Sequence, residues 1–218
     1  MYKLYTRMKN RIIVSAAGLL AGTLALMGQI TASEAFSTAP NTVFPLLDSS
    51  TRMDMIDYFN SGMSNTSTNN LKGQSAVTSL SDKALSVKMT DSSTAQIVVL
   101  DAGSGQVVAV ISTVAAPGLD SSIAFFDADW NALPDGNYFA KPRIDDWLTP
   151  EGKANKAEVE MQVPFMIASY NYDPSTGKLL LVNNLNRFLD EDIYDIVSRY
   201  LRPTLSYTWN GKRFVLDR

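Results

Sequence analysis

The sequence predicts an α+β fold in which a mainly antiparallel β meander carries two amphipathic helices. Apolar runs at residues 97–100 and 106–114 flank a glycine-rich break, and a third run at 122–127 follows the turn at Pro117. Short apolar runs joined by turn residues are typical of consecutive antiparallel strands. Apolar residues recur at helical spacing in two other segments, one before and one after this meander.

Residues 1–35 have the pattern of a secretory leader. Four Lys and Arg residues lie in the first 11 positions, residues 12–27 carry no charge, and small residues follow at Ala32, Ser33 and Ala35. This order is that of a signal peptide, and cleavage after Ala35 is favoured over cleavage after Ala32. The competing interpretation is a membrane anchor, but the apolar run is shorter than the roughly 20 residues that a spanning helix needs.

The composition of residues 36–218 excludes several classes of function. This part has 15 Lys and Arg against 21 Asp and Glu, a net charge of −6. An acidic exported chain is a poor match for nucleic acid and for anionic lipid, and we find no further apolar segment long enough to span a bilayer. Without Cys there is no disulfide and no acylated lipoprotein cysteine. Without His, Ser-His-Asp nucleophiles and His-ligated zinc are excluded.

We therefore expect no cofactor and a soluble product, in the periplasm or outside the cell, that is not a lipoprotein. The remaining 36–218 form one domain, with two subdomains as the alternative. The seam would then lie near 140–157, a charged segment that carries Pro150 and Gly152.

Two helices are predicted from capping residues and apolar spacing. Asp48, Ser49 or Ser50 can cap the first, because their side-chain oxygens accept hydrogen bonds from free backbone amides. Its apolar positions are Met55, Ile56, Phe59 and Met63. The second begins near Asp190 and ends at Pro203, and its buried stripe is predicted to be Ile193, Ile196, Val197 and Tyr200.

The remaining strands are predicted as hairpins. Residues 76–79 and 84–89 form one, and alternation along 85–89 indicates a strand with one solvated face. Residues 158–172 are predicted as a strand that turns back into 178–182. The terminal hairpin turns at Asn-Gly, the strongest two-residue turn signal.

Aromatic residues concentrate near the end of the meander. The candidate binding residues are Phe126, Trp130, Tyr138 and Trp147. Exposed aromatic side chains mark contacts with sugars or proteins. The alternative is that these side chains fill a second core beneath residues 134–157.

Asp127, Asp129 and Asn131 have the alternating oxygen ligands with which a calcium loop opens. The rest of the loop does not fit. Ala132 stands where the sharp turn needs glycine, and Tyr138 stands where the bidentate glutamate belongs. The competing interpretation is a strand end that runs into a polar turn.

Several segments together resemble a bacterial family of exported proteins of unknown function. They are residues 44–48, 52–58, 90–93, 111–114 and 120–130. The resemblance covers most of the chain after the leader. It implies export in a restricted set of bacteria with two membranes, no assigned activity, and no active site to transfer.

From these observations we expect a non-enzymatic module that binds a protein or a glycan of the cell envelope through the aromatic-rich region 125–147. The alternative is a hydrolase of envelope glycans that uses Asp54 and Asp57. Paired carboxylates can hydrolyse glycosides when they face one another across a cleft.

Overall fold

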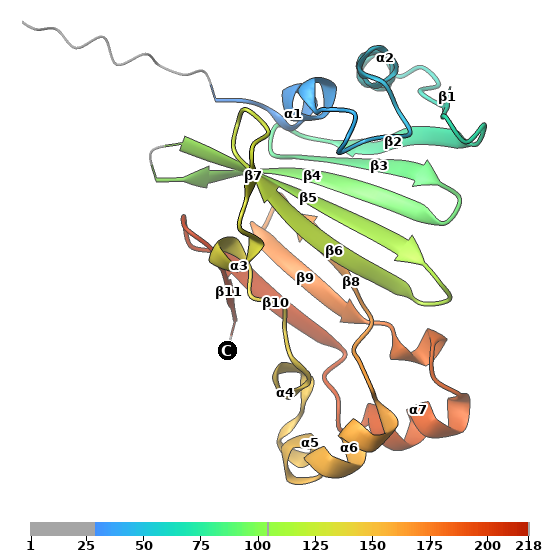
Figure 1. The fold of residues 1–218 in the computed structure, drawn as a ribbon, viewed down its shortest axis with the longest axis vertical. Helices are drawn as coiled ribbons and strands as arrows, with labels where there is room; N and C mark the ends of the chain where they lie inside the picture. Colours follow the sequence, from blue (N-terminus) through green and yellow to red (C-terminus); the bar gives the residue numbers. More distant parts are fainter. Residues whose placement is uncertain (1–28, 104, 218) are drawn as a thin grey trace, which may run out of the picture.

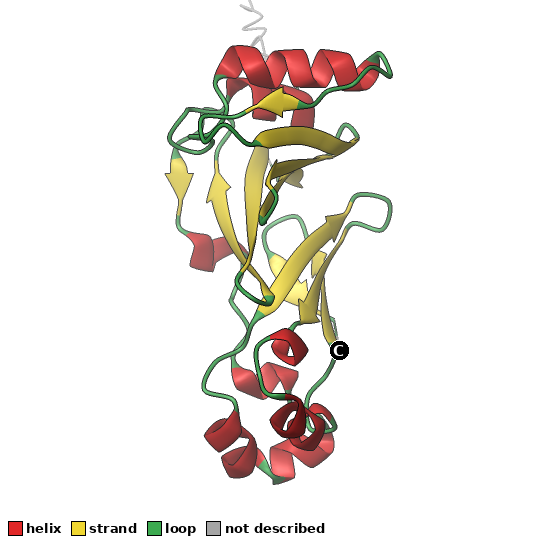
Figure 2. Cartoon of the chain, turned by 90° about the vertical axis from the view of Figure 1, so that its right-hand side faces the viewer, coloured by secondary structure: helices red, strands yellow, loops and turns green. Residues whose placement is uncertain are grey.

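The computed structural model describes residues 29–103 and 105–217 and confirms the α+β class. Two antiparallel sheets pack against one another, with helices at both ends of the molecule (Figures 1 and 2). Most of the predicted leader lies outside the described residues. In the described part of the chain, no helix combines the length and the apolar character that a bilayer-spanning segment requires.

The larger sheet is the predicted meander, with its seven strands side by side in chain order (Figure 1). Its strands are β1 (Ser67–Thr68), β2 (Gln74–Leu80), β3 (Ala84–Thr90), β4 (Ser93–Ala102), β5 (Gly105–Ala115), β6 (Leu119–Phe126) and β7 (Ala132–Leu133). The glycine-rich break is a tight turn in which Ala102 pairs with Gly105. Gly103 adopts φ +53° there, a backbone conformation that favours glycine.

The smaller sheet has four antiparallel strands in the order β11-β10-β9-β8. They are β8 (Ala168–Asp173), β9 (Lys178–Asn183), β10 (Thr204–Trp209) and β11 (Phe214–Leu216). Both predicted hairpins are present, although the first strand of the earlier one begins later than predicted. In the second, the side-chain oxygen of Asn210 accepts hydrogen bonds from the N–H groups of Lys212 and Arg213. Gly211 supplies the positive φ that the turn requires.

The two faces of β4 belong to two different cores. Ile97 and Val99 pack on one face with α1 (Ala32–Thr38) and α2 (Ser49–Asn60). Val98 and Leu100 pack on the other face with the smaller sheet. Successive side chains of a strand point to opposite faces, so a strand covered on both sides needs a continuous apolar run. The apolar runs at 97–100 and 107–111 therefore lie in central strands of the larger sheet.

Both predicted helices are present. Asp48 caps α2 and accepts a hydrogen bond of 2.7 Å from the N–H of Thr51. The second is α7 (Glu191–Ser198), in which Val197 is buried. The predicted stripe is wrong at Ile196, which is 48% exposed.

The prediction of a strand over 158–172 is wrong in its first half. Residues 156–162 form α6 (Lys156–Gln162), and the strand begins only at Ala168. Val159 is buried but Met161 is 78% exposed, whereas a strand would direct both side chains to the same face. The Lys, Ala, Glu, Met and Gln residues of this segment are good helix formers.

Short helices lie in the connections that follow β7 and β9. They are α3 (Asp135–Tyr138), α4 (Ile144–Trp147), α5 (Pro150–Ala154) and the 3-10 helix η1 (Leu185–Arg187) that follows β9. Phe139, Trp147 and Leu148 from this region are buried in the same core as the smaller sheet. Residues 134–157 therefore form part of that core.

A buried arginine holds the first two helices together. The Arg52 guanidinium donates to the carbonyl oxygens of Leu47, at 3.0 Å, and of Ala39. It also lies 5.9 and 5.8 Å from the rings of Phe36 and Phe44. Burial lowers its pKa from the ordinary value, and the nearby Asp48 opposes that shift. A buried cation needs such partners because desolvation alone strongly disfavours it.

The helix α1 is part of this core. Ala32, Ala35 and Phe36 are almost completely buried. Thr31 and Glu34 form a reciprocal capping box, and the side-chain oxygen of Gln106 accepts a hydrogen bond from the N–H of Ile30. A leader boundary after Ala35, or after Ala32, would remove part of this packing.

The edge strand β8 has its outward amides capped by side chains of the larger sheet. The N–H of Ala168 donates to Asp120, that of Tyr170 to Ser121, and that of Tyr172 to Gln96, at 3.2, 2.9 and 2.8 Å. The Gln96 amide also donates to the carbonyl oxygen of Tyr172, at 2.9 Å. The two sheets are thus joined by hydrogen bonds as well as by apolar packing.

Removing the start of α1 will destabilise the fold. We expect the free energy of unfolding of a chain that begins at Phe36 to be about 3 kcal/mol lower than that of a chain that begins at Gln29. The shorter chain lacks the helix cap and the buried alanines. For a domain of this size the midpoint should fall by roughly 6–12 °C. Thermal unfolding of the two chains measures this. Equal midpoints, together with a mature N-terminus at Phe36 by mass spectrometry, would support the boundary after Ala35.

Removing a side chain that caps a β8 amide will lower the free energy of unfolding, because the amide is left without a hydrogen-bond acceptor. Ser121→Ala leaves the N–H of Tyr170 without its partner, and Gln96→Leu does the same for Tyr172. Each should lower the free energy of unfolding by about 1–3 kcal/mol, the cost of an unsatisfied buried group. Ser122→Ala is the matched control, because Ser122 is exposed on the same strand. Denaturant unfolding checks this, and equal losses for Ser121→Ala and Ser122→Ala would refute the capping role.

Candidate functional site

The structure separates the four aromatic candidates. Trp147 is 0% exposed and lies in the core with the smaller sheet, so it has no surface to offer a ligand. Phe126 and Trp130 are half-buried against the core of α1 and α2. Tyr138 is half-buried against the other core. These side chains do not form one patch, because alternation along β6 directs neighbouring aromatic residues to opposite faces.

Tyr138 is the candidate with the most open surroundings. Its ring stacks on Phe125, with centroids 5.1 Å apart, and lies nearly parallel to Trp209 at 6.4 Å. It borders a shallow depression of about 380 Å³ together with Asn137 and Lys212. Tyr138 therefore combines a structural contact with an accessible edge.

The proposed calcium ligands form a turn that is closed by its own hydrogen bonds. One carboxylate oxygen of Asp127 accepts hydrogen bonds from the N–H groups of Asp129 and Asn131, both at 2.9 Å. Its second oxygen accepts one from the Asn131 side-chain amide, also at 2.9 Å. Within residues 29–103 and 105–217, no three acidic residues come together as a cation site. Asp127 acts here as an acceptor for the turn.

This turn presents Trp130 to α1. Trp130 adopts φ +65°, which is uncommon for a bulky residue. Its indole N–H donates to the Thr38 hydroxyl at 3.3 Å, and its ring packs 5.2 Å from that of Phe126. The contacts with α1 and with Asp127 offset the backbone strain. Trp130 thus ties the β6–β7 turn to the first helix.

The carboxylates of the hydrolase alternative lie on the solvent side of α2. Asp54 and Asp57 are both exposed. Neither lines any of the depressions described for residues 29–103 and 105–217. Across one helical turn they are neighbours on a convex surface, whereas a glycosidase pair faces its substrate across a cleft.

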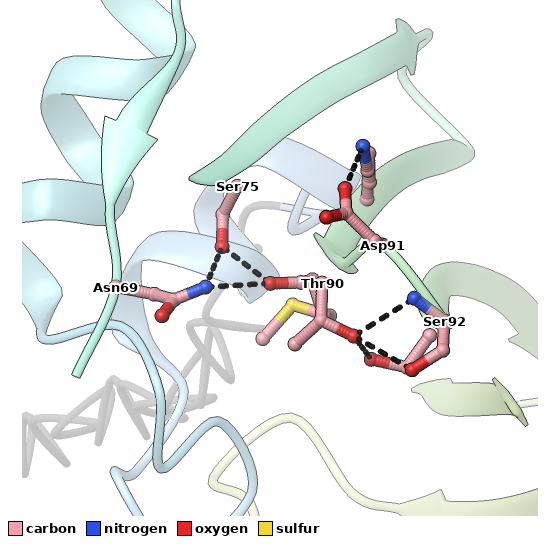
Figure 3. Close-up of polar contacts among 8 residues, drawn as sticks. Asn69, Ser75, Thr90, Asp91 and Ser92 are labelled. Atoms are coloured by element: carbon pink, nitrogen blue, oxygen red, sulfur yellow. Dashed lines mark hydrogen bonds and ion pairs between the residues drawn. The ribbon is translucent and has the colours of Figure 1, made fainter. Parts of the chain in front are cut away.

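A polar cluster in the larger sheet joins the loop before β2 to the end of β3 (Figure 3). The buried Asn69 donates to the Ser75 hydroxyl and to the carbonyl of Met89, at 3.0 and 2.9 Å. Its own oxygen accepts hydrogen bonds from the N–H groups of Leu71 and Gly73. The hydroxyl of Ser75 donates to the same Met89 carbonyl, so this cluster is structural.

The strongest candidate site is a recess beside β11, which we call the cationic recess. It has a volume of about 330 Å³ and lies between β11 and the α3–α4 connection. Its charged lining residues are Lys141, Arg143, Arg213 and Asp146. All three cations are exposed, and the ion pairs seen in the described part of the chain involve other side chains.

The one carboxylate of the recess is already engaged. Asp146 accepts a hydrogen bond of 2.8 Å from the N–H of Arg143. The buried rings of Tyr207 and Phe214 also line the recess. Burial raises the pKa of Tyr207, and the Asp146 charge adds to that shift. The recess therefore presents an excess of positive charge beside an apolar wall.

A second, larger depression lies next to the same connection. It has a volume of about 480 Å³, shares Lys141 and Arg143 with the cationic recess, and is walled by Ile144, Phe165 and Met166 among others. The ring of Phe165 is 54% exposed and packs 5.1 Å from that of Phe188. A concave apolar surface with a few converging charges is typical of a binding site.

The cationic recess could not be found from sequence. Lys141 and Arg143 fall within the aromatic-rich region 125–147, but Arg213 comes from the terminal hairpin. No local motif joins residues so far apart in the chain. They meet because the α3–α4 connection passes alongside the edge of the smaller sheet (Figure 1).

Comparison with known proteins gives a family and a fold. A family profile described as "Protein of unknown function (DUF3256)" matches residues 24–214. A solved domain of an uncharacterized protein from Porphyromonas gingivalis W83 superposes with a TM-score of 0.73 and 20% identity. The alignment covers 87% of this chain and 99% of that one, and it shows a shared fold. Among curated proteins, none matches the chain.

The pKa of Asp127 should depend on the closed turn. Donation from the Asn131 side chain, followed by its backbone N–H, lowers this pKa below the ordinary value of 3.8. Because the pKa of Asp127 is lower in the folded protein than in the unfolded chain, its ionised carboxylate stabilises the fold at pH values above the unfolded pKa. This contribution is lost as the pH falls through the folded pKa.

We expect Asp127→Ala to lower the melting midpoint and Asp129→Ala to leave it unchanged. Thermal melting checks this, and an increase in midpoint on adding calcium would instead support a cation site.

Proposed function

This chain belongs to the DUF3256 family of proteins of unknown function, and we propose that it is an exported, non-catalytic module that binds a protein or glycan component of the cell envelope. The basic, apolar and small-residue order of the first 35 residues supports export. The cationic recess supports binding. The contact surface that we propose is centred on residues 138–144 and β11, within and beside the aromatic-rich region 125–147.

The observation that carries this proposal is the gathering of Lys141, Arg143 and Arg213 on one concave surface. The whole chain has 19 basic residues against 22 acidic ones, for a net charge of −3. Three exposed cations that form no ion pair with any residue the structure describes are thus a local exception on an acidic molecule. Local charge of one sign steers an oppositely charged partner and fixes its orientation.

The neighbouring apolar surface gives such a partner a second area of contact. Phe165 and Phe188 expose parts of their rings next to the depression that shares Lys141 and Arg143. Aromatic and arginine side chains are enriched at the centres of protein interfaces. A ligand that crosses the α3–α4 connection would touch both surfaces. The partner should therefore carry negative charge together with apolar groups.

Charge reversal in the recess will weaken binding to envelope fractions. We expect Lys141→Glu, Arg143→Glu and Arg213→Glu each to reduce binding about tenfold, because each places a like charge against an anionic partner. Lys72→Glu is the matched control, since Lys72 is exposed and lines none of the depressions described. Co-sedimentation of the purified protein with washed envelope fractions measures binding.

The dependence of binding on salt concentration gives a second test of the same proposal. Binding through exposed charges should weaken as ionic strength rises, because the screening length shortens to about 8 Å at physiological salt. Equal binding by all four variants, at low and at high salt, would contradict a functional role for the cationic recess. Loss of binding by Lys72→Glu as well would show nonspecific attraction and would contradict it too.

A further inference from the structure

The two edges of the smaller sheet differ in whether their outward backbone groups have hydrogen-bond partners. At β8 the outward amides of residues 168, 170 and 172 all donate to side chains of the larger sheet. At the other edge lies β11, which pairs with β10 on one side and, among residues 29–103 and 105–217, has no strand on its other side (Figure 1). One edge is therefore capped, and the other is available for pairing.

The hydrogen bonds of the hairpin show which groups of β11 point outward. The N–H of Asn210 donates to the carbonyl of Arg213, and the N–H of Asp217 donates to that of Ser206. Hydrogen-bonded pairs alternate along an antiparallel ladder, so Val215 faces Thr208 in the same way. The N–H and C=O groups of Phe214 and Leu216 therefore point away from β10, towards the free edge.

The free edge runs along the cationic recess. Residues 213–216 line it consecutively, with Ala140, Lys141 and Arg143 on its opposite side. A chain laid against β11 would thus lie between its outward backbone groups and the cations. Addition of an extended peptide to a sheet edge is a recurrent mode of recognition, in which the main chain gives affinity and side-chain contacts give specificity.

We propose that β11 accepts an extended, acidic segment of a partner polypeptide as a fifth strand of the smaller sheet. This rests on the proposed function and names its partner as a protein. The partner's backbone pairs with Phe214 and Leu216, and its carboxylates lie against Lys141, Arg143 and Arg213. The exposed side chain of Val215 offers an apolar contact to alternate residues of the incoming strand.

The alternative is that a short edge with nearby cations only prevents aggregation. Proteins protect free edges with short strands and with charged residues. Protection needs no recess and no particular charge on another chain. Strand addition, in contrast, needs the outward N–H groups and negative charge on the added chain. The two interpretations therefore differ in what an acidic peptide does.

The test uses a fluorescent peptide that alternates glutamate and valine, titrated against the folded protein and followed by anisotropy. We expect saturable binding that falls about tenfold with Arg213→Glu and is absent for the same peptide with lysine in place of glutamate. Leu216→Pro removes an outward N–H, and proline is tolerated at an edge where no ladder bond is lost. It should abolish binding, whereas Leu216→Ala, which loses the same packing, should retain it.

A second pair of probes does not depend on the folding of a variant. An added strand pairs only every second amide with β11. N-methylation of one alternate set of peptide amides should therefore block binding, and methylation of the other set should not. Equal effects of the two sets would overturn strand addition. So would equally tight binding of an acidic polysaccharide that is unaffected by Leu216→Pro, since that would identify a glycan.

The outcome is separable from that of the proposed function. If the peptide fails to bind but envelope binding still depends on Lys141 and Arg143, strand addition is refuted and the binding module stands. If the peptide binds but envelope fractions do not distinguish the charge-reversed proteins, the edge accepts strands and the proposed envelope role is refuted.

Discussion

The structure depends on how the outward backbone of β8 is satisfied. An amide buried between two sheets costs free energy unless it finds an acceptor. Here Asp120, Ser121 and Gln96 supply acceptors at every second residue of the strand, in step with the ladder on its other side. The Ser121 hydroxyl is in turn hydrogen-bonded to Thr113 at 2.7 Å. This spacing fixes the position of the smaller sheet along the larger one and closes the core between them.

The position of the candidate site follows from this constraint. Strand β8 anchors the smaller sheet to the larger one. The smaller sheet continues from β8 through β9 and β10 to β11, which lies beside the α3–α4 connection. That connection leaves the larger sheet at α3, where Asp135 accepts a hydrogen bond from the N–H of Phe125. Phe139 and Trp147 are buried on either side of Lys141 and Arg143. Buried anchors thus hold an exposed, charged segment along an open strand edge.

Sequence patterns predicted the parts of the fold that local chemistry decides. Continuous apolar runs identified β4 and β5, turn residues identified the hairpins, and Asp48 marked the start of α2. The patterns failed where tertiary packing decides. The strand predicted over 158–172 is helical in its first part, and Ile196, which was predicted to be buried, is 48% exposed. The cationic recess combines Lys141 with Arg213, and no periodicity relates residues that distant.

Amide hydrogen exchange in the native protein tests the central claim most directly, since protection reports hydrogen bonding residue by residue. If β8 is capped and β11 is open, the amides of Ala168, Tyr170 and Tyr172 exchange slowly while those of Phe214 and Leu216 exchange fast. Fast exchange at the three β8 amides would show that the larger sheet does not cap that edge. Slow exchange at Phe214 and Leu216 would show that the edge proposed for partner binding is already closed.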